Sequence, residues 1–162
     1  MNELVGAGVI QKYALFEAAA QMRYTEPIAT LDADVLVAVR APERLDLLEP
    51  IYAFCAARGY VPEGEGIRVG AWPVQFVPVF DALTSESVEQ ADTVDFEGVP
   101  LRVVRAVHLA VIALKVGRAR DFARILALLE AESVTPEEIA GLAGKHGLEK
   151  AWQGFAARFL GG

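Results

Sequence analysis

The chain has 162 residues, of which 54% are hydrophobic and 23% charged, and its net charge is −7. This length suits one domain, and the apolar content can offset the entropy lost on folding, which excludes wholesale disorder. The acidic balance argues against broad, non-specific binding to nucleic acid or anionic membranes. No apolar run approaches the ~20 residues of a membrane helix. With one cysteine, Cys55, and no signal segment at the start, we expect a reducing, cytoplasmic setting and no membrane partner.

The first third of the chain alternates helix-forming and strand-forming segments. Residues 9–22 are rich in alanine and carry apolar residues at helical spacing, which predicts a helix. The β-branched run at 35–39 predicts a strand covered on both sides. Residues 42–58 predict a second helix, with a kink or a fresh start at Pro50 and an end at Gly59.

Two hairpins and a short helix should follow. Residues 67–79 contain two β-rich runs around a turn-prone Gly-Ala-Trp-Pro segment, which predicts the first hairpin. Residues 93–104 repeat this pattern around Glu-Gly and predict the second hairpin. The helix between them should begin at a cap provided by Thr84 or Ser85 and end near Ala91.

Beyond Arg105 the whole pattern is helical. Residues 106–116 are apolar nearly all round, which predicts a buried core helix. A stripe that includes Phe122 marks the next helix, and Thr-Pro-Glu-Glu at 135–138 combines an N-cap, a proline in the first turn and a capping box. A last helix is expected at 148–159.

These elements predict an α+β fold with a small mixed sheet. We expect a single domain over residues 1–162, with a sheet-containing part at about 1–104 and a helical part at about 105–162.

Basic residues are concentrated in one segment of this acidic chain. Between Arg102 and Arg124 there are six basic residues and one acid, a local charge of +5. Such a patch can hold a compact anion such as a phosphate. The alternative is that these side chains lie on solvated helix faces and make ordinary ion pairs.

Two aspartates separated by one residue, Asp32 and Asp34, precede the buried strand. Residues i and i+2 of a strand point to the same face, so both carboxylates can face one spot. Like charges so close are costly unless a cation lies between them, and Mg²⁺ favours one or two carboxylates together with substrate phosphates. The alternative is that Asp32 caps a turn while Asp34 is exposed.

Several segments together resemble the nucleotidyltransferase-like proteins related to abortive-infection (type IV) toxins. The segments that carry this resemblance are Lys12–Ala19, Tyr24–Pro27, Thr30–Val35, Gly70–Phe76, His108–Lys115 and Gly117–Asp121. They span roughly residues 10–156, and their order is more specific than any one of them. The resemblance implies a polymerase-beta-like nucleotidyltransferase core.

The resemblance also implies roles for particular residues. It implies catalytic, metal-binding aspartates at Asp32 and Asp34, and nucleotide contacts at Thr30, Lys115 and Arg118. For the two basic residues the alternative is a structural bridge to Asp121. The implied cofactor is Mg²⁺, and the implied partners are an NTP or another phosphate ligand, an RNA or protein acceptor, and an antitoxin or a second copy of the chain.

The sequence departs from the pattern of active members in two places. The glycine pair expected on the first helix aligns with Phe16-Glu17, which would obstruct the approach of a phosphate. The third carboxylate falls near 74–77, where Gln75 supplies no charge, and Asp81 lies beyond the strand. Glu17 turned inward is one candidate to replace the missing carboxylate.

The leading hypothesis is a nucleotidyltransferase-like protein that transfers a nucleoside monophosphate from NTP-Mg²⁺ to a hydroxyl acceptor, with reduced or lost activity. The main alternative is a non-catalytic module that binds a nucleotide, an RNA end or a protein partner. A structural oligomerisation protein is the third alternative.

Overall fold

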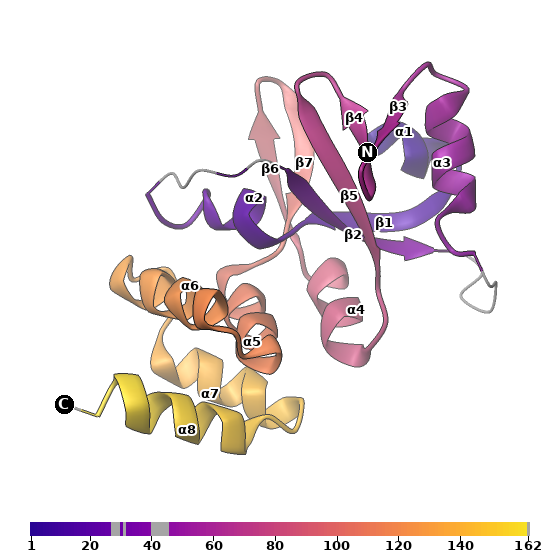
Figure 1. The fold of residues 1–162 in the computed structure, drawn as a ribbon. Helices are drawn as coiled ribbons and strands as arrows, with labels where there is room; N and C mark the ends of the chain where they lie inside the picture. The colour runs from indigo at the N-terminus through magenta and orange to yellow at the C-terminus, as the bar shows by residue number, and fades with distance from the viewer. Residues whose placement is uncertain (27–29, 31, 40–45, 162) are drawn as a thin grey trace.

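The computed structural model describes all residues except 27–29, 31, 40–45 and 162. In the described residues, seven strands form one mixed sheet in the order β3-β4-β5-β2-β1-β7-β6 (Figure 1). The strands are β1 (Ile10–Leu15), β2 (Ala33–Val39), β3 (Val61–Glu63), β4 (Gly66–Val69), β5 (Trp72–Pro78), β6 (Asp92–Phe96) and β7 (Val99–Val103). The helices are α1 (Asn2–Gly6), α2 (Glu17–Gln21), α3 (Glu49–Ala56), α4 (Ala82–Glu89), α5 (Ala106–Val116), α6 (Ala119–Glu130), α7 (Pro136–Lys145) and α8 (Glu149–Phe159). The protein is therefore an α+β protein.

The centre of the sheet is built from strands that are far apart in sequence. Strand β2 pairs antiparallel with β1 and parallel with β5. Strand β1 also lies parallel to β7, while β3-β4-β5 and β6-β7 are joined as antiparallel hairpins. The two predicted hairpins are thus present and flank the β1-β2 pair.

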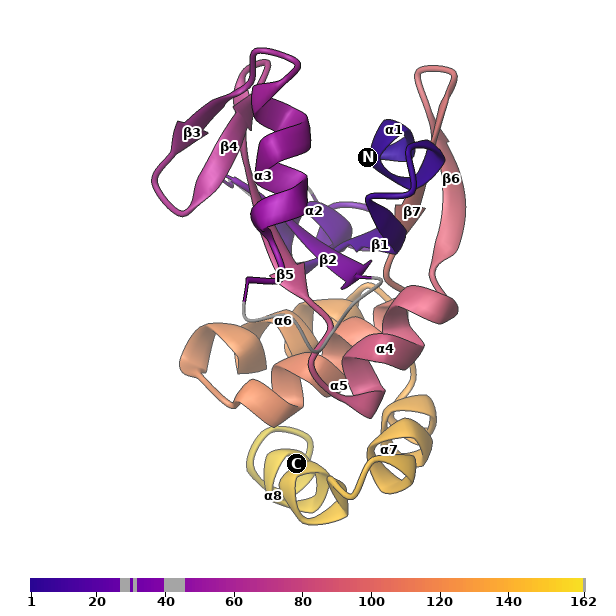
Figure 2. The ribbon, with the colours of Figure 1, turned by 90° about the vertical axis from the view of Figure 1, so that its right-hand side faces the viewer.

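Two apolar layers cover the two faces of the sheet. Figure 2 shows α1 and α3 above the central strands and α4 to α8 below them. Alternation along β2 divides its side chains between these layers: Val35 and Val37 belong to the core with α1 and α3, and Leu36 belongs to the core with the helices below. Because Asp34 is two residues before Leu36, it shares the lower face, which we call the helical face.

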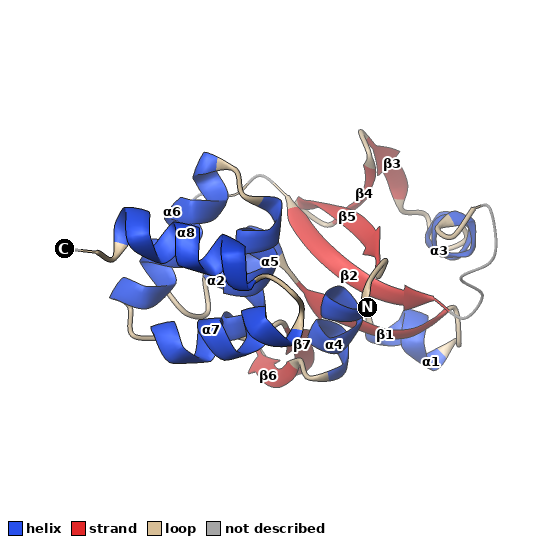
Figure 3. Cartoon of the chain, turned by 90° about the horizontal axis from the view of Figure 1, so that it is seen from below, coloured by secondary structure: helices blue, strands red, loops and turns tan. Residues whose placement is uncertain are grey.

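Helix α5 is the centre of the helical part. Every residue from His108 to Leu114 is buried, which confirms the core helix expected at 106–116. Helices α6, α7 and α8 pack around it, and Figure 3 shows α5 to α8 grouped on one side with the strands on the other. Among the described residues, no helix is long and apolar enough to cross a membrane.

The helix predicted at 9–22 is wrong over most of its length. Residues Ile10–Leu15 form β1, and only Glu17–Gln21 are helical. The register of β1 against β2 is irregular between Ile10 and Lys12, and this lets Ile10 and Tyr13 be buried in the same core although they are three residues apart. The irregular strand therefore imitates the spacing of a helix face, and strand pairing overrides alanine's helix propensity.

Three smaller corrections concern helix starts and missed elements. Helix α4 is capped by Asp81, whose Oδ1 accepts from the backbone N–H of Thr84 at 2.7 Å, and not by Thr84 or Ser85. Helix α3 starts at Glu49 with Pro50 in its first turn, so Pro50 marks a new helix start and not a kink. Residues 42–45 of the predicted helix lie outside the described residues. Helix α1 and strand β3 were not predicted.

Gly66, the first residue of β4, lies so close to the backbone of β5 that only glycine fits there. A Cβ added to Gly66 would lie 2.3 Å from the carbonyl oxygen of Val74. We expect Gly66→Ala to lower the free energy of unfolding by about 1–3 kcal/mol through overpacking, as measured by urea denaturation. The control is Gly141→Ala in α7, where nothing lies within 4 Å; helix propensity should there raise stability by about 0.5–1 kcal/mol. Equal stability of the two variants would contradict the prediction.

Candidate functional site

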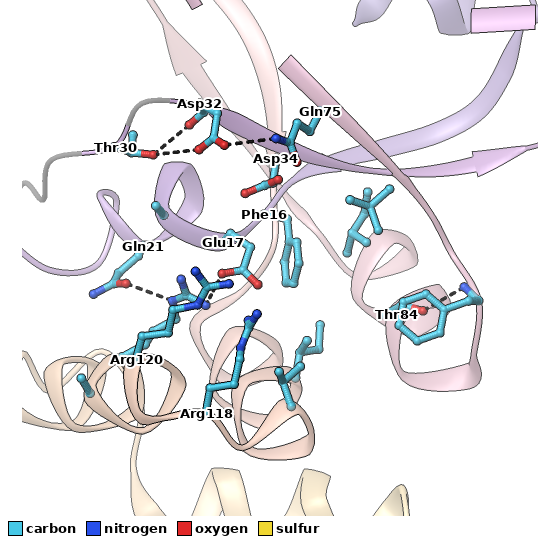
Figure 4. A pocket seen from close by; sticks show the side chains of 18 residues that line it. Phe16, Glu17, Gln21, Thr30, Asp32, Asp34, Gln75, Thr84, Arg118 and Arg120 are labelled. Atoms are coloured by element: carbon cyan, nitrogen blue, oxygen red, sulfur yellow. Dashed lines mark hydrogen bonds and ion pairs between the residues drawn. The ribbon is translucent and has the colours of Figure 1, made fainter. Parts of the chain in front are cut away.

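A cavity of about 740 Å³ lies between the helical face of the sheet, α2 and the helices α5 and α6 (Figure 4). Its lining has three chemically distinct parts: an acidic wall, an arginine wall and an apolar end. The acidic wall comes from the start of β2 and the arginine wall from α6. The apolar end consists of Phe16, Leu36, Val77, Phe80, Ile112 and Val116.

The acidic wall contains both aspartates of the predicted pair. Asp32 precedes β2, and Asp34 is its second residue. The Thr30 hydroxyl donates to Asp32 Oδ1 at 3.3 Å, and Gln75 Nε2 donates to Asp32 Oδ2 at 3.3 Å. The structure thus brings Thr30, Asp32 and Asp34 to one cavity.

Asp34 has a pKa above its ordinary value. Burial and, after it, the negative charges of Asp32 and Glu17 together raise its pKa to about 6, against the opposing charges of Arg124 and Arg120. Burial is the largest cause, and among the neighbouring charges the two acids outweigh the two arginines, so negative charge is in excess beside this carboxylate.

This excess charge fits a divalent cation bound with further ligand oxygens. Among the described residues, no group of three or more His, Cys, Asp or Glu side chains is arranged to hold a metal ion. Two carboxylates completed by phosphate oxygens and water are the kind of donor set that Mg²⁺ favours. Asp32 and Asp34 are therefore the residues that would hold such an ion.

Gln75 occupies the position opposite Asp34 on the neighbouring strand. The parallel register of β2 and β5 pairs Asp34 with Gln75. A side chain here can approach both aspartates, but the amide contributes a hydrogen bond and no charge. The sequence predicted that no third acid would stand near residues 74–77. The residue that the register places opposite Asp34 is indeed Gln75.

The arginine wall consists of Arg118, Arg120 and Arg124. Arg124 Nη1 lies 2.5 Å from Glu17 Oε2, and its Nε donates to Gln21 Oε1 at 3.0 Å. Arg118 donates through Nε and Nη2 to the two oxygens of Asp121, at 2.7 and 3.1 Å. Arg120 makes no ion pair with any residue that the structure describes, so its charge is available to a ligand.

Phe16 and Glu17 lie at the junction of β1 and α2, where Glu17 is the first helical residue, and not in the middle of a helix as predicted. Phe16 is the extended N-cap residue of α2. Glu17 has φ +50°, in the left-handed region that favours glycine, at a cost of about 1 kcal/mol or more for another residue. The glycine expected from the resemblance would adopt this backbone without strain.

The structure does not bring Lys115 to the aspartates. Lys115 does not line the cavity; it pairs with Asp81, and its Nζ lies 5.8 Å from the centre of the Phe80 ring. The alternative partner, Asp121, is not its partner either. Arg118 does line the cavity and also makes the bridge to Asp121, while its contact with a phosphate stays a prediction.

Sequence reasoning missed two arginines of the cavity lining, Arg120 and Arg124, as individual site residues. Their i, i+4 spacing places them on one helix face, which is the signal that could have found them. Gln21, which is buried in α2, carried no such signal.

Comparison with known proteins does not extend this description. No family model matches the chain, and no curated protein matches it.

Proposed function

We propose that this protein is nucleotidyltransferase-like: the cavity binds a nucleoside triphosphate with Mg²⁺, and transfer of the nucleoside monophosphate to a hydroxyl acceptor is slow. One observation carries the proposal. The paired carboxylates of Asp32 and Asp34 lie across a single cavity from three arginines. This pattern suits a ligand that brings a cation to one wall and phosphate oxygens to the other.

Each wall has a separate task in this proposal. Asp32, oriented by Thr30, and Asp34 would hold the ion. Bound Mg²⁺ neutralises phosphate charge and makes the phosphorus more electrophilic. Arg120 binds a phosphate through its guanidinium, which pairs with no acid of the described part of the chain, while Arg118 is held in place by Asp121. The apolar end, with Phe80 at its exposed rim, accommodates the base.

We expect transfer to be slow because the cavity has one acid fewer than active members of the family and one of its arginines is already neutralised. Gln75 provides no third carboxylate, and Glu17 already neutralises Arg124. Stabilisation of charge is usually the largest contribution to this kind of catalysis, and a single lost group typically costs a factor of about 10²–10³.

A non-catalytic nucleotide-binding module is the second candidate. Gln75 favours it, because its amide donates to Asp32 Oδ2 and so uses an oxygen that a metal ion would need. In such a module the ligand would bind and no product would form.

Labelling with each radioactive NTP, in Mg²⁺ or Mn²⁺ and with pooled RNA or protein acceptors, tests the proposal. We expect weak labelling that Asp32→Asn abolishes. The matched control is Asp95→Asn, near the end of β6, where the new amide oxygen can still accept from the backbone N–H of Gly98. Mg²⁺-dependent binding without labelling would favour the module. Nucleotide binding weaker than about 1 mM would contradict both candidates.

A further inference from the structure

Arg124 already forms an ion pair with a carboxylate of the protein, that of Glu17. Its side chain is only 10% exposed and contacts Glu17 and Gln21, both from α2. Among the described residues, the next carboxylate oxygen is Asp121 Oδ1, at 3.9 Å from Arg124 Nη1. Figure 4 shows Glu17 between Asp34 above and the α6 arginines below, inside the cavity. The ion pair is therefore part of the cavity lining.

Glu17 holds this position at a cost on two counts. Its backbone is left-handed, with φ +50°. Its carboxylate adds negative charge beside Asp34, which already faces Asp32. Two other glutamates, Glu97 and Glu132, also have left-handed backbones, but both are exposed. Glu17 differs from them because its carboxylate is largely buried against an arginine of the cavity.

We propose that Arg124 is a phosphate subsite and that Glu17 is its built-in competitor, which restricts the cavity to ligands able to displace a carboxylate. Carboxylate and phosphate oxygens accept the same guanidinium N–H groups, so a phosphate that binds Nη1 of Arg124 has to displace Glu17. Glu17 also repels a polyphosphate directly. This inference rests on the proposed function, because it identifies which wall residue takes a phosphate and what limits its affinity.

Glu17 as a substitute metal ligand is the opposing interpretation, and it predicts the opposite result. A metal ligand removed by mutation weakens Mg²⁺-dependent binding, whereas a competitor removed by mutation strengthens anion binding. The sign of the change therefore decides between the two.

The test is the affinity of the full chain for inorganic pyrophosphate, measured by calorimetry with and without Mg²⁺, in Glu17→Gln. This variant removes the charge and keeps the side-chain size. The ligand then gains a hydrogen bond to the charged guanidinium of Arg124. We therefore expect its affinity to rise about tenfold or more. An unchanged affinity, or a loss that appears only with Mg²⁺, would overturn the inference.

Two glycine variants separate charge from backbone strain. Glu17→Gly removes the carboxylate and relieves the left-handed strain, and it should bind pyrophosphate at least as tightly as Glu17→Gln. Glu132→Gly makes the same change in charge at φ +51°, outside the cavity, and should leave the affinity unchanged. An equal gain in Glu132→Gly would overturn the inference, because it would trace the effect to net charge or to strain.

Pyrophosphate also keeps this result separate from the proposed function, since it has no base and no group to transfer. A gain in pyrophosphate affinity without any labelling by NTPs supports the subsite and contradicts transfer. Labelling by NTPs without a gain in the Glu17 variants supports transfer and overturns the subsite.

Discussion

Replacing Gln75 by glutamate is expected to raise the Mg²⁺-dependent rate of nucleotide transfer by about 100-fold, the size of effect that one well-placed charged group contributes. Gln75 is paired with Asp34 in the register of β2 and β5, and its amide reaches Asp32 at 3.3 Å. A carboxylate at this position would border both aspartates. It would complete a set of three acids from two neighbouring strands.

The same variant should be less stable without the ion, because three carboxylates then repel one another. We expect Gln75→Glu to unfold at a lower temperature than the unmodified chain in chelator and to gain more from added Mg²⁺. Gln153→Glu, on the exposed surface of α8, adds the same charge away from the cavity and should change neither property. Unchanged labelling together with an unchanged response to Mg²⁺ would contradict the prediction.

The acidic wall could be predicted from sequence because a strand has a simple period. The run Val35–Val39 marks the strand, and positions 32 and 34 continue its alternation to the face of Leu36. Nothing in this step depends on distant residues. The sequence could not show that Gln75 lies opposite Asp34, because that pairing is a register between strands far apart in the chain.

Strand β1 shows where local reasoning fails. Its apolar residues have helical spacing, and alanine follows them. The partner that makes this segment a strand begins at Ala33, after α2 has intervened. The error mattered for the site, because it placed Phe16 and Glu17 in the middle of a helix. At the junction of β1 and α2 they line the cavity instead.

The basic segment shows why a charge count predicts a site but not its members. Three of its six basic residues are occupied elsewhere: Arg102 donates to backbone carbonyls of Tyr13 and Val88, Arg105 pairs with Asp92, and Lys115 pairs with Asp81. The other three line the cavity. The sequence offered an anion site and ordinary ion pairs as alternatives. In the structure, half of the basic residues line the cavity and the other half make contacts elsewhere. Helix packing decides this division.

Removing the carboxylate of Asp121 is expected to cost about 2–3 kcal/mol of unfolding free energy, through lost charge-assisted hydrogen bonds and a lost helix cap. Asp121 is fully buried and accepts three N–H groups of Arg118, from the backbone and from the guanidinium. Arg118 is half exposed and can be solvated again, so the loss stays below that of a fully buried ion pair. Urea denaturation of Asp121→Ala measures this cost. Glu130→Ala, on the exposed end of the same helix, should change stability by about 0.5 kcal/mol or less.

The effect of Asp121 should also depend on pH in a defined direction. Burial by itself raises the pKa of Asp121, but the hydrogen bonds and charge of Arg118 outweigh burial and hold this pKa below its ordinary value of 3.8. A carboxylate with a lowered folded-state pKa contributes its full stability above the unfolded-state pKa and loses it as the pH falls through the folded-state pKa. The difference in unfolding free energy between the unmodified chain and Asp121→Asn should therefore be constant from about pH 7 to about pH 5 and shrink below about pH 4. A difference that stays constant down to the acid unfolding of both proteins would show that the carboxylate charge does not stabilise the start of α6 and the arginine wall beside it.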